Sequence, residues 1–290
     1  MNKKPVMPWL FIGPHLVLFF IFFLIPAGFG IYISFTRWNL RGTPTFVGLE
    51  NYREILFNAG STFHSQLYSG LSNTFLFVIL TVPFCILFPL LFATALNTKP
   101  KLMKIFQSVF YLPSLFSISA VAIIWSLLFS RAFGPINRIF GLDINWLGEQ
   151  PYAWFTLVAV TVWWTIGNNM IIYQAAFSGV PTDYYEAASI DGANAVQKFF
   201  SISLPSIKNQ ILYTLVLTTI AQFNIIGQPM MMTGGGPVGS TTVLLMYINE
   251  NAFGHASPSI AGIASAMAVI LGLCIMAASA IQFRVLRTRD

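Results

Sequence analysis

This sequence is poor in charged residues, which make up 8% of its 290 positions. A soluble domain of average composition carries about 25% charged residues, so this chain lacks the side chains to cover a surface exposed to water. The composition excludes a disordered chain and a fibrous protein, and it argues against most soluble enzymes. The mean hydropathy of +0.72 indicates that much of the chain lies in apolar surroundings.

Side chains that form chemical sites are also scarce. The two cysteines, Cys85 and Cys274, lie in apolar stretches, and the three histidines are scattered without an acid or cysteine at metal-ligand spacing. The sequence contains no G-x-S-x-G, no H-E-x-x-H and no buried acidic pair. It therefore predicts no catalytic residue, no metal site and no cofactor. The net charge of +6 includes no basic run of five or more, so nucleic acid is not an expected partner.

Six stretches contain no Asp, Glu, Lys or Arg and are long enough to cross a bilayer. A charge at mid-membrane costs about 2.5–3.5 kcal/mol even on lenient insertion scales, so charge-free stretches of this length indicate spanning helices. The sequence predicts an all-α integral membrane protein. Its spans are placed at about 11–35, 71–96, 105–129, 153–178, 209–230 and 260–283.

Lysine and arginine predict the orientation of these spans, because cytoplasmic loops are enriched in both. With the N-terminus inside, ten of the 15 basic residues lie on the cytoplasmic side and five lie outside. We therefore expect both termini on the cytoplasmic side of the membrane. The cytoplasmic group is Lys3, Lys4, Lys99, Lys101, Lys104, Lys198, Lys208, Arg284, Arg287 and Arg289, and the outer group is Arg37, Arg41, Arg53, Arg131 and Arg138.

The segment 180–208, between the fourth and fifth spans, is too polar to span and too long for a tight connection. Asp183 and Glu186, three residues apart, predict a capped helix start. Gly192 follows an aspartate in a turn signal, and a second helical run is expected to stop at Pro205. The pattern predicts two short helices joined at Gly192.

The two helices offer a face of small side chains, which let another backbone or the wall of a groove come close. A helix laid in the groove of a partner protein is a common mode of recognition. The alternative is a helical hairpin that packs under its own bundle. The pattern alone leaves both open, and the residues concerned are Ala187, Ala188, Gly192 and Ala193.

The spacing in this segment is specific. From Glu186 the chain reads Glu-Ala-Ala, three residues, Gly192, nine residues, and then Ile-Ser-Leu-Pro at 202–205. This resembles the EAA signature of permease subunits of binding-protein-dependent ABC importers. Further pieces resemble the carbohydrate-uptake branch of that family: F-V-G-L-E-N-Y at 46–52, Asn73-Thr74, Leu112-Pro113, T-G-G-G-P at 233–237 and Q-F-R at 282–284.

The resemblance covers about residues 9 to 288 and implies one transmembrane permease domain over 1–290, a six-helix bundle with a cytoplasmic coupling helix. It implies alternating access driven by a dimer of ATP-binding cassette ATPases, so the chain itself would be a transport subunit and not an enzyme. A second permease subunit and an extracytoplasmic substrate-binding protein are the other implied partners, besides membrane lipid. The residues implied to dock on the ATPase are Glu186, Ala187, Ala188 and Gly192.

A sugar, oligosaccharide or polyol cargo would need amides to match its hydroxyl groups and aromatic faces to stack on. Uncharged polar and aromatic residues in the spans are therefore candidates for a substrate path, with hydrogen bonding between helices as the alternative role. The candidates are Trp163, Trp164, Asn168 and Asn169 in the fourth span, and Gln222, Asn224 and Gln228 in the fifth.

Two rival functions remain at this point: a stand-alone ion-coupled secondary transporter, and an intramembrane enzyme or assembly factor. The lack of any acid inside the spans argues against ion coupling, which usually needs ionisable residues along the path. The glycine-rich loop at 233–237 lacks the G-K-[ST] ending of a phosphate-binding loop, which favours a bent outer loop. Prolines within the spans are either ordinary kinks or hinges, among them Pro14, Pro26, Pro83, Pro89 and Pro113.

Overall fold

The computed structural model describes residues 7–254 and 260–286. Its regular structure is almost wholly helical, which confirms the predicted all-α class, and within the described residues the strands form one two-stranded ribbon. The chain divides into two compact units. Four basic residues used in the orientation argument lie outside the described residues, namely Lys3, Lys4, Arg287 and Arg289.

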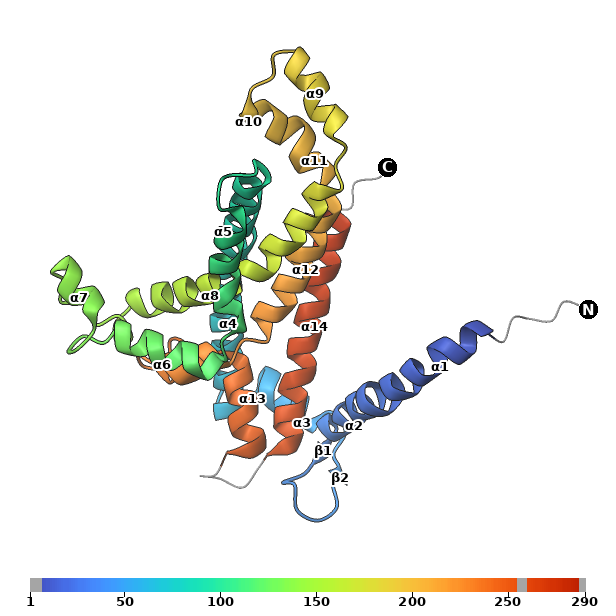
Figure 1. The fold of residues 1–290 in the computed structure, drawn as a ribbon. Helices are drawn as coiled ribbons and strands as arrows, with labels where there is room; N and C mark the ends of the chain where they lie inside the picture. The colour runs from blue at the N-terminus through green and yellow to red at the C-terminus, as the bar shows by residue number, and fades with distance from the viewer. Residues whose placement is uncertain (1–6, 255–259, 287–290) are drawn as a thin grey trace, which may run out of the picture. The chain divides into compact units, whose positions relative to one another are not determined.

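The first unit contains the chain up to Tyr68 together with Tyr247–Gly272. Its two short strands pair antiparallel, with Thr36 opposite Phe46. The first apolar stretch is helical throughout, because a π-helical turn joins two α-helices (Figure 1). The elements are α1 (Met7–Phe19), η1 (Phe20–Leu24), α2 (Ile25–Ser34), β1 (Thr36–Arg37), β2 (Thr45–Phe46), α3 (Glu50–Phe57) and parts of α4 (Thr62–Asn97), α13 (Leu244–Phe253) and α14 (Ala261–Leu286).

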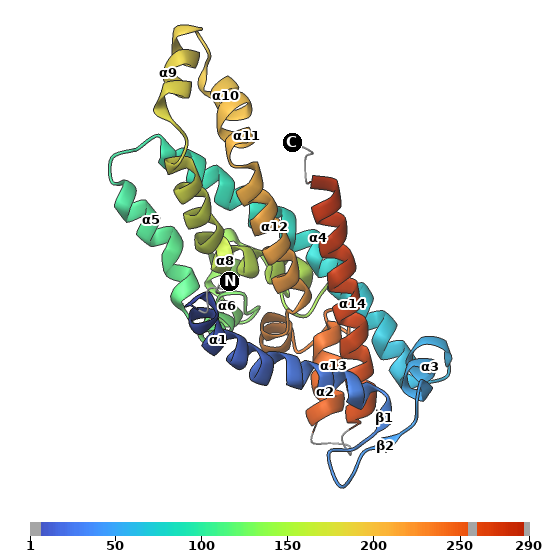
Figure 2. The ribbon, with the colours of Figure 1, turned by 90° about the vertical axis from the view of Figure 1, so that its right-hand side faces the viewer.

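The second unit contains Ser69–Met246 and the chain from Leu273 onward. It holds most of α4, the last turns of α14 and a series of further helices, of which α5 and α12 both pack on α8 (Figures 1 and 2). These are α5 (Met103–Tyr111), η2 (Leu112–Leu115), α6 (Ile118–Leu128), α7 (Pro135–Phe140), α8 (Tyr152–Ser178), α9 (Thr182–Ile190), α10 (Ala195–Lys198), η3 (Phe199–Ser203), α11 (Leu204–Ser206), α12 (Lys208–Phe223) and η4 (Pro229–Thr233).

Two apolar clusters form the core of the second unit. One joins α4, α6 and α8 to the chain that follows α12, and it includes Phe77, Val121 and Leu157. The other joins the far end of α4 to α8 and to the start of α12, around Tyr173 and Ile207. The two clusters pack the long helices together near both ends of α8 and at two places along α4. This packing fixes the points from which the polar connecting segments leave the helices.

Four helices are long and apolar enough to cross a membrane, and they match four of the predicted spans. They are Phe11–Ser34, Thr62–Asn97, Tyr152–Ser178 and Ala261–Val285. In the first of these only 6% of the most apolar window is buried inside the chain, although its residues are strongly apolar. Side chains of this kind need an apolar solvent around them, as a lipid bilayer provides.

The third predicted span, 105–129, is not one straight helix. It consists of Met103–Leu115 and Ile118–Leu128, which meet at an angle of 100° and together amount to a fifth candidate span. Pro113 lies at the start of the 3-10 turn η2 and cannot donate a backbone hydrogen bond there. The proline at this position therefore marks a sharp bend and not a mild kink.

The fifth predicted span, 209–230, also differs from the expectation. Its α-helix α12 ends at Phe223 after 16 residues, and the π-helical turn η4 begins only at Pro229. Asn224 is the C-cap residue of this helix, and its side-chain amide donates a hydrogen bond to the carbonyl of Ile220 at 2.8 Å. The structure therefore contains four to five candidate spans, and the count of six stays a prediction.

In the first unit, one buried side chain organises the chain after α2. The amide of Asn51 in α3 donates hydrogen bonds to the carbonyls of Ser34 at 2.8 Å and Thr36 at 2.9 Å. A side chain at Gly262 would come within 2.0 Å of the Thr36 carbonyl oxygen, so α14 approaches the same backbone closely. Next to Asn51, Glu50 forms an exposed ion pair with Arg37.

We predict that Asn51→Ala destabilises the protein, whereas Glu50→Ala changes its stability little. The first change leaves buried carbonyls without a partner, at about 1–3 kcal/mol each. The second removes an exposed ion pair, which is typically worth about 0.2–1 kcal/mol. The measurement is the thermal unfolding midpoint of each purified variant in detergent. Equal midpoints for the two variants would contradict the role assigned to Asn51.

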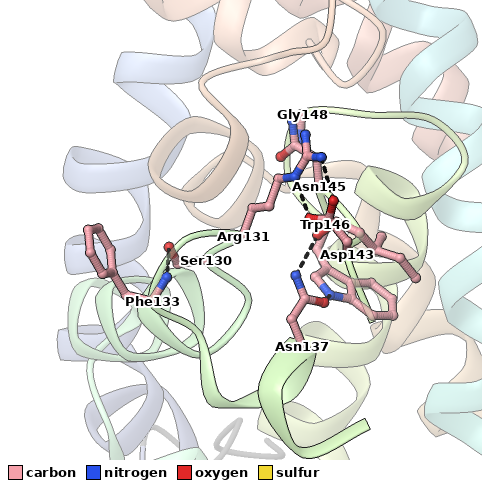
Figure 3. Close-up of polar contacts among 9 residues, drawn as sticks. Ser130, Arg131, Phe133, Asn137, Asp143, Asn145, Trp146 and Gly148 are labelled. Atoms are coloured by element: carbon pink, nitrogen blue, oxygen red, sulfur yellow. Dashed lines mark hydrogen bonds and ion pairs between the residues drawn. The ribbon is translucent and has the colours of Figure 1, made fainter. Parts of the chain in front are cut away.

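In the second unit, residues 130–150 form a polar hairpin around α7 (Figure 3). Arg131 donates two hydrogen bonds to the carboxylate of Asp143, at 2.7 and 2.8 Å. Asn137 donates to the carbonyl of Ile144 and accepts from the indole of Trp146 at 2.7 Å. The hydrogen bonds and the charge of Arg131 hold the pKa of Asp143 below its ordinary value.

We predict that this hairpin loses part of its stability in acid. A carboxylate whose pKa is lowered by folding contributes stability above its ordinary pKa of about 4, and that stability disappears as the pH falls through the lowered value. The difference in unfolding midpoint between the wild type and Asp143→Asn should therefore be largest near neutral pH and shrink below about pH 4. In an Arg131→Gln background the difference should be absent at every pH, and its persistence would refute the pairing.

Candidate coupling segment and substrate path

The segment 180–208 folds as two short helical arms that project beyond the ends of α8 and α12 (Figures 1 and 2). The first arm is α9, and it begins at Thr182 directly after Pro181, as predicted. The predicted capping pair of Asp183 with Glu186 is wrong, because Pro181 occupies the cap position and no side chain caps the helix. Asp183 lies inside the first turn, where its negative charge favours the positive end of the helix dipole.

The turn between the arms forms at Gly192, as the sequence predicts. Gly192 has φ of +77°, a conformation that only glycine adopts without strain. Its amide donates to the carbonyl of Ser189 at 3.1 Å, and the amide of Ala193 donates to the carbonyl of Ala188 at 2.9 Å. These two bonds form a Schellman motif, which satisfies the last carbonyls of α9 and fixes the direction of the second arm.

The second arm begins with a true capping box. The Asn194 side chain accepts from the amide of Gln197, and the Gln197 side chain accepts from the amide of Asn194. The arm continues through α10, η3 and α11 as far as Ser206, so the expectation that Pro205 ends it is wrong. The π-helical turn η3 lies just before Pro205, and the missing amide of the proline is tolerated at the start of the short α11.

Two side-chain contacts tie the arms to each other. The hydroxyl groups of Tyr185 in α9 and Ser203 in η3 share a hydrogen bond of 3.0 Å. The ammonium group of Lys198 donates to the hydroxyl of Ser189 at 2.6 Å. Sequence reasoning missed both pairs, because their members are 18 and 9 residues apart and depend on the angle of the turn. The contacts make the two arms one body.

The predicted docking residues lie on this body with their surfaces largely open. Glu186, Ala187 and Gly192 are exposed, and Ala188 is half-buried. Among the described residues the carboxylate of Glu186 has no hydrogen-bond or ion-pair partner. Ile190, the last residue of α9, is 88% exposed, which is unusual for so apolar a side chain. The face therefore combines an apolar residue, small residues and an unpaired carboxylate.

The aromatic candidates for the substrate path lie on α8 beside the bend of the third span. The indole of Trp164 donates to the carbonyl of Phe116 at 3.1 Å, which occupies its only donor. Trp163 packs edge-on against Trp125, with 5.2 Å between the ring centroids, and keeps 38% of its surface exposed. Asn168 is exposed. Trp163 and Asn168 are thus the α8 candidates with free surface.

The remaining candidates differ in how many of their side-chain amide atoms already have hydrogen-bond partners within the chain. Asn169 spends both amide hydrogens on contacts between helices, to the carbonyl of Cys85 and the hydroxyl of Thr218. Gln222 and Gln228 are 4% and 2% exposed, and each has one amide atom without a partner in the described structure. Their free atoms can bond to a polar group that enters from outside.

The glycine-rich loop at 233–237 is bent, as predicted, with positive φ at Gly234 and Gly235. Its amides are turned inward, since Gly235 donates to the carbonyl of Pro229 and Gly236 to that of Thr233. The loop therefore presents no open row of amides to a phosphate. In the described part of the chain no three His, Cys, Asp or Glu side chains gather as a metal site would require.

The second-span pair Asn73-Thr74 anchors this loop. The Asn73 amide donates to the carbonyls of Gly239 and Thr242, at 3.1 and 3.0 Å. The Thr74 hydroxyl accepts from the amide of Leu244 at 3.0 Å. In the same unit Gln282 of α14 donates to the hydroxyl of Thr219 in α12 at 2.8 Å. The sequence pieces Asn73-Thr74 and Q-F-R at 282–284 thus hold loops and helices in place.

Comparison with known proteins agrees with the sequence pattern. A family model described as "Binding-protein-dependent transport system inner membrane component" matches residues 56–289. The probable ABC transporter permease protein YesP of Bacillus subtilis is 35% identical over 284 residues, which cover 94% of this chain and 89% of that protein. The arabinooligosaccharides transport system permease protein AraP of Halalkalibacterium halodurans is 32% identical and covers 97% of this chain and 88% of its own length.

A solved structure has the same fold. It is described as a bacterial alginate ABC transporter in complex with an alginate pentasaccharide-bound periplasmic protein. One of its chains matches this chain with a TM-score of 0.79 at 21% identity, over 98% of this chain and 96% of that one. At this identity the match shows the fold alone.

Proposed function

This chain belongs to the family of binding-protein-dependent transport system inner membrane components, and we propose that it moves a sugar, oligosaccharide or polyol across the cytoplasmic membrane by alternating access. As a member of this family it is a multi-pass membrane protein and a transport subunit, not an enzyme. The named cargo of its relative AraP, arabinooligosaccharides, supports a carbohydrate, and the absence of charged residues from the predicted spans agrees with a neutral cargo.

The single observation that supports the coupling mechanism is the rigid two-armed segment with Glu186 unpaired on its surface. In the proposal this segment is the coupling helix, and Glu186, Ala187, Ala188 and Gly192 dock into a cleft on an ATP-binding cassette ATPase. Small residues allow the close approach, and a carboxylate can form a charge-assisted hydrogen bond with the ATPase. Closure of the ATPase dimer then moves the arms and, with them, α12.

The proposed assembly contains this chain as one permease domain over 1–290, a second permease subunit, the ATPase dimer and an extracytoplasmic substrate-binding protein. The proposal includes six spans, with the broken segments around Phe116 and Asn224 counted as parts of the third and fifth. Both termini and the coupling segment are placed in the cytoplasm. The cargo path is placed beside Trp163, Asn168, Gln222 and Gln228, with Trp164, Asn169 and Asn224 as its supporting residues.

We predict that Glu186→Lys and Gly192→Asp uncouple ATP hydrolysis from uptake while the protein still inserts into the membrane. The lost charge-assisted contact and the strained turn should each lower uptake per ATP by roughly tenfold, since such contacts are worth about 1.5–3 kcal/mol. Uptake and ATPase activity are measured on the complete complex in vesicles. Glu250→Lys, the same change at an exposed position on α13, is the control. Normal coupling in both variants would refute the docking face.

The orientation gives a separate prediction. Lys101 and Val238 are exposed, and their loops are placed on opposite sides of the membrane. In a chain with Cys85 and Cys274 replaced by serine, Val238→Cys should react with a membrane-impermeant thiol reagent in intact spheroplasts. Lys101→Cys should react only after the membrane is permeabilised. The reverse pattern would overturn the orientation, whatever the result for coupling.

A further inference from the structure

A cavity of about 510 Å³ lies where the two arms of the coupling segment meet the ends of α4 and α8. Its volume falls within the usual range for small-molecule sites. Three parts of the chain line it: residues 94–99 at the end of α4, the end of α8 around Ser178, and the arms from Thr182 to Ser203. The hydrogen bond between Tyr185 and Ser203, both lining residues, fixes one wall.

Two lysines and no carboxylate line this cavity. Lys99 comes from the turn after α4, and Lys198 comes from the second arm. Lys198 donates one of its three hydrogens to Ser189, which positions its ammonium group and leaves two hydrogens free. Within the described part of the chain neither lysine is in an ion pair. The cavity is therefore a concentration of uncompensated positive charge.

The inner wall of the cavity is apolar. Phe177 is 3% exposed and Phe199 is half-buried, and both belong to the apolar cluster around Tyr173 and Ile207. Exposed apolar side chains continue next to the lining residues, with Phe200 61% and Val196 64% exposed. A ligand with one charged end and one apolar end matches this lining better than a small hydrated anion does.

The cavity also adjoins the ends of two candidate spans, which in the proposed orientation is the level of the cytoplasmic lipid headgroups. The candidate spans Thr62–Asn97 and Tyr152–Ser178 both end at its lining residues. Lysines just beyond the cytoplasmic ends of spanning helices attract anionic lipids, at about 1 kcal/mol for each basic residue. Position, charge and apolar wall thus point to the same class of ligand.

We propose that this cavity binds the headgroup of an anionic phospholipid from the cytoplasmic leaflet. The phosphate lies between Lys99 and Lys198, the hydroxyl groups of the lining bond to its glycerol, and the first part of an acyl chain covers Phe199 and Phe200. One lipid thereby links the turn after α4 to the second arm. The proposal rests on the proposed function for the orientation of the chain and for the role of the arms.

The linkage has a consequence for coupling. Lys99 lies on the turn between two spanning segments, whereas Lys198 lies on the arm that the ATPase is proposed to move. An anion shared by both lysines resists their separation, so an anionic leaflet stiffens the connection between the arm and the bundle. Uptake per ATP should accordingly be higher in vesicles that contain phosphatidylglycerol than in vesicles of phosphatidylcholine alone.

The test is a binding measurement on the complete purified complex. Delipidated complex is titrated with short-chain phosphatidylglycerol and followed by native mass spectrometry. Lys99→Gln/Lys198→Gln should weaken binding at this site about 30-fold, which corresponds to two lysines at about 1 kcal/mol each. Lys101→Gln/Lys104→Gln, in the turn after Lys99 and the first turn of α5 but outside the cavity, should bind as the wild type does. Lys99→Arg/Lys198→Arg should retain binding. Unchanged binding by the double glutamine variant overturns the site.

A second measurement on the wild-type complex avoids substitutions altogether. Lysine acetylation mapped by mass spectrometry should slow at Lys99 and Lys198, but not at Lys101, when phosphatidylglycerol is added. Equal protection by phosphatidylcholine overturns the role of charge. Equal protection by inorganic phosphate at the same concentration would show that the site binds a soluble anion, which overturns the proposal of a lipid.

Neither binding measurement requires transport. If phosphatidylglycerol protects the two lysines while Glu186→Lys stays coupled, the lipid site stands and the proposed docking face fails. If Glu186→Lys is uncoupled while the lysines remain unprotected, the docking face stands and the lipid site fails. The two proposals therefore fail separately.

Discussion

The structure depends on one constraint: a backbone amide or carbonyl in apolar surroundings must find its partner within the chain. An unbroken helix meets this constraint by itself, but the segments around Phe116 and Asn224 are broken. At the first break, the indole of Trp164 donates to the carbonyl of Phe116, and the Ser117 side chain accepts from the amide of Ala120. At the second, the Asn224 side chain donates to the carbonyl of Ile220. Side chains next to the breaks therefore supply hydrogen-bond partners for backbone groups there.

The same constraint explains the short sequence pieces that carry the family resemblance. Asn51, Asn73 and Gln282 each use a side-chain amide to hold a segment distant in sequence, and Asn51 and Asn73 do so by donating to backbone carbonyls. An amide suits this role because it supplies two donors in a fixed plane without a charge to desolvate. These residues hold segments of the fold in place, and the positions of the candidate path residues depend on that fold.

Features that depend on single residues or short segments could be predicted from the sequence, whereas features that depend on contacts between distant segments could not. Charge-free length predicted four long helices correctly, because the cost of a buried charge acts on each residue independently of its neighbours. The turn at Gly192 was also predictable, since its signal is local. The bend between Leu115 and Ile118 was not, because a nearby proline permits either a kink or a break. The contacts beside this bend come from the distant α8, where Trp164 bonds to Phe116 and Gly167 lies close to Tyr111. The false capping pair at Asp183 fails for a similar reason: Pro181 and the exit from α8 fix where α9 begins.

The candidate path was predictable by residue type only. Asn169 and Gln222 looked alike in sequence, yet Asn169 has spent both amide hydrogens on neighbouring helices while Gln222 retains a free oxygen. A buried polar atom without a partner is costly, at about 1–3 kcal/mol, unless another state of the protein or a ligand supplies one. In the proposed alternating-access cycle, a hydroxyl-bearing cargo beside Gln222 would remove this cost, so the free oxygen would favour the loaded intermediate over the empty one.

The route from the coupling segment to this region is a single covalent element. The hydrogen-bonded arms join α12 directly at Lys208, and α12 extends 16 residues, roughly 24 Å at 1.5 Å per residue, to the break at Asn224. Beyond that break, Gly227 lies so close to Ile118 that a side chain would come within 2.7 Å of it. A displacement of the arms along α12 would therefore act on both broken segments together.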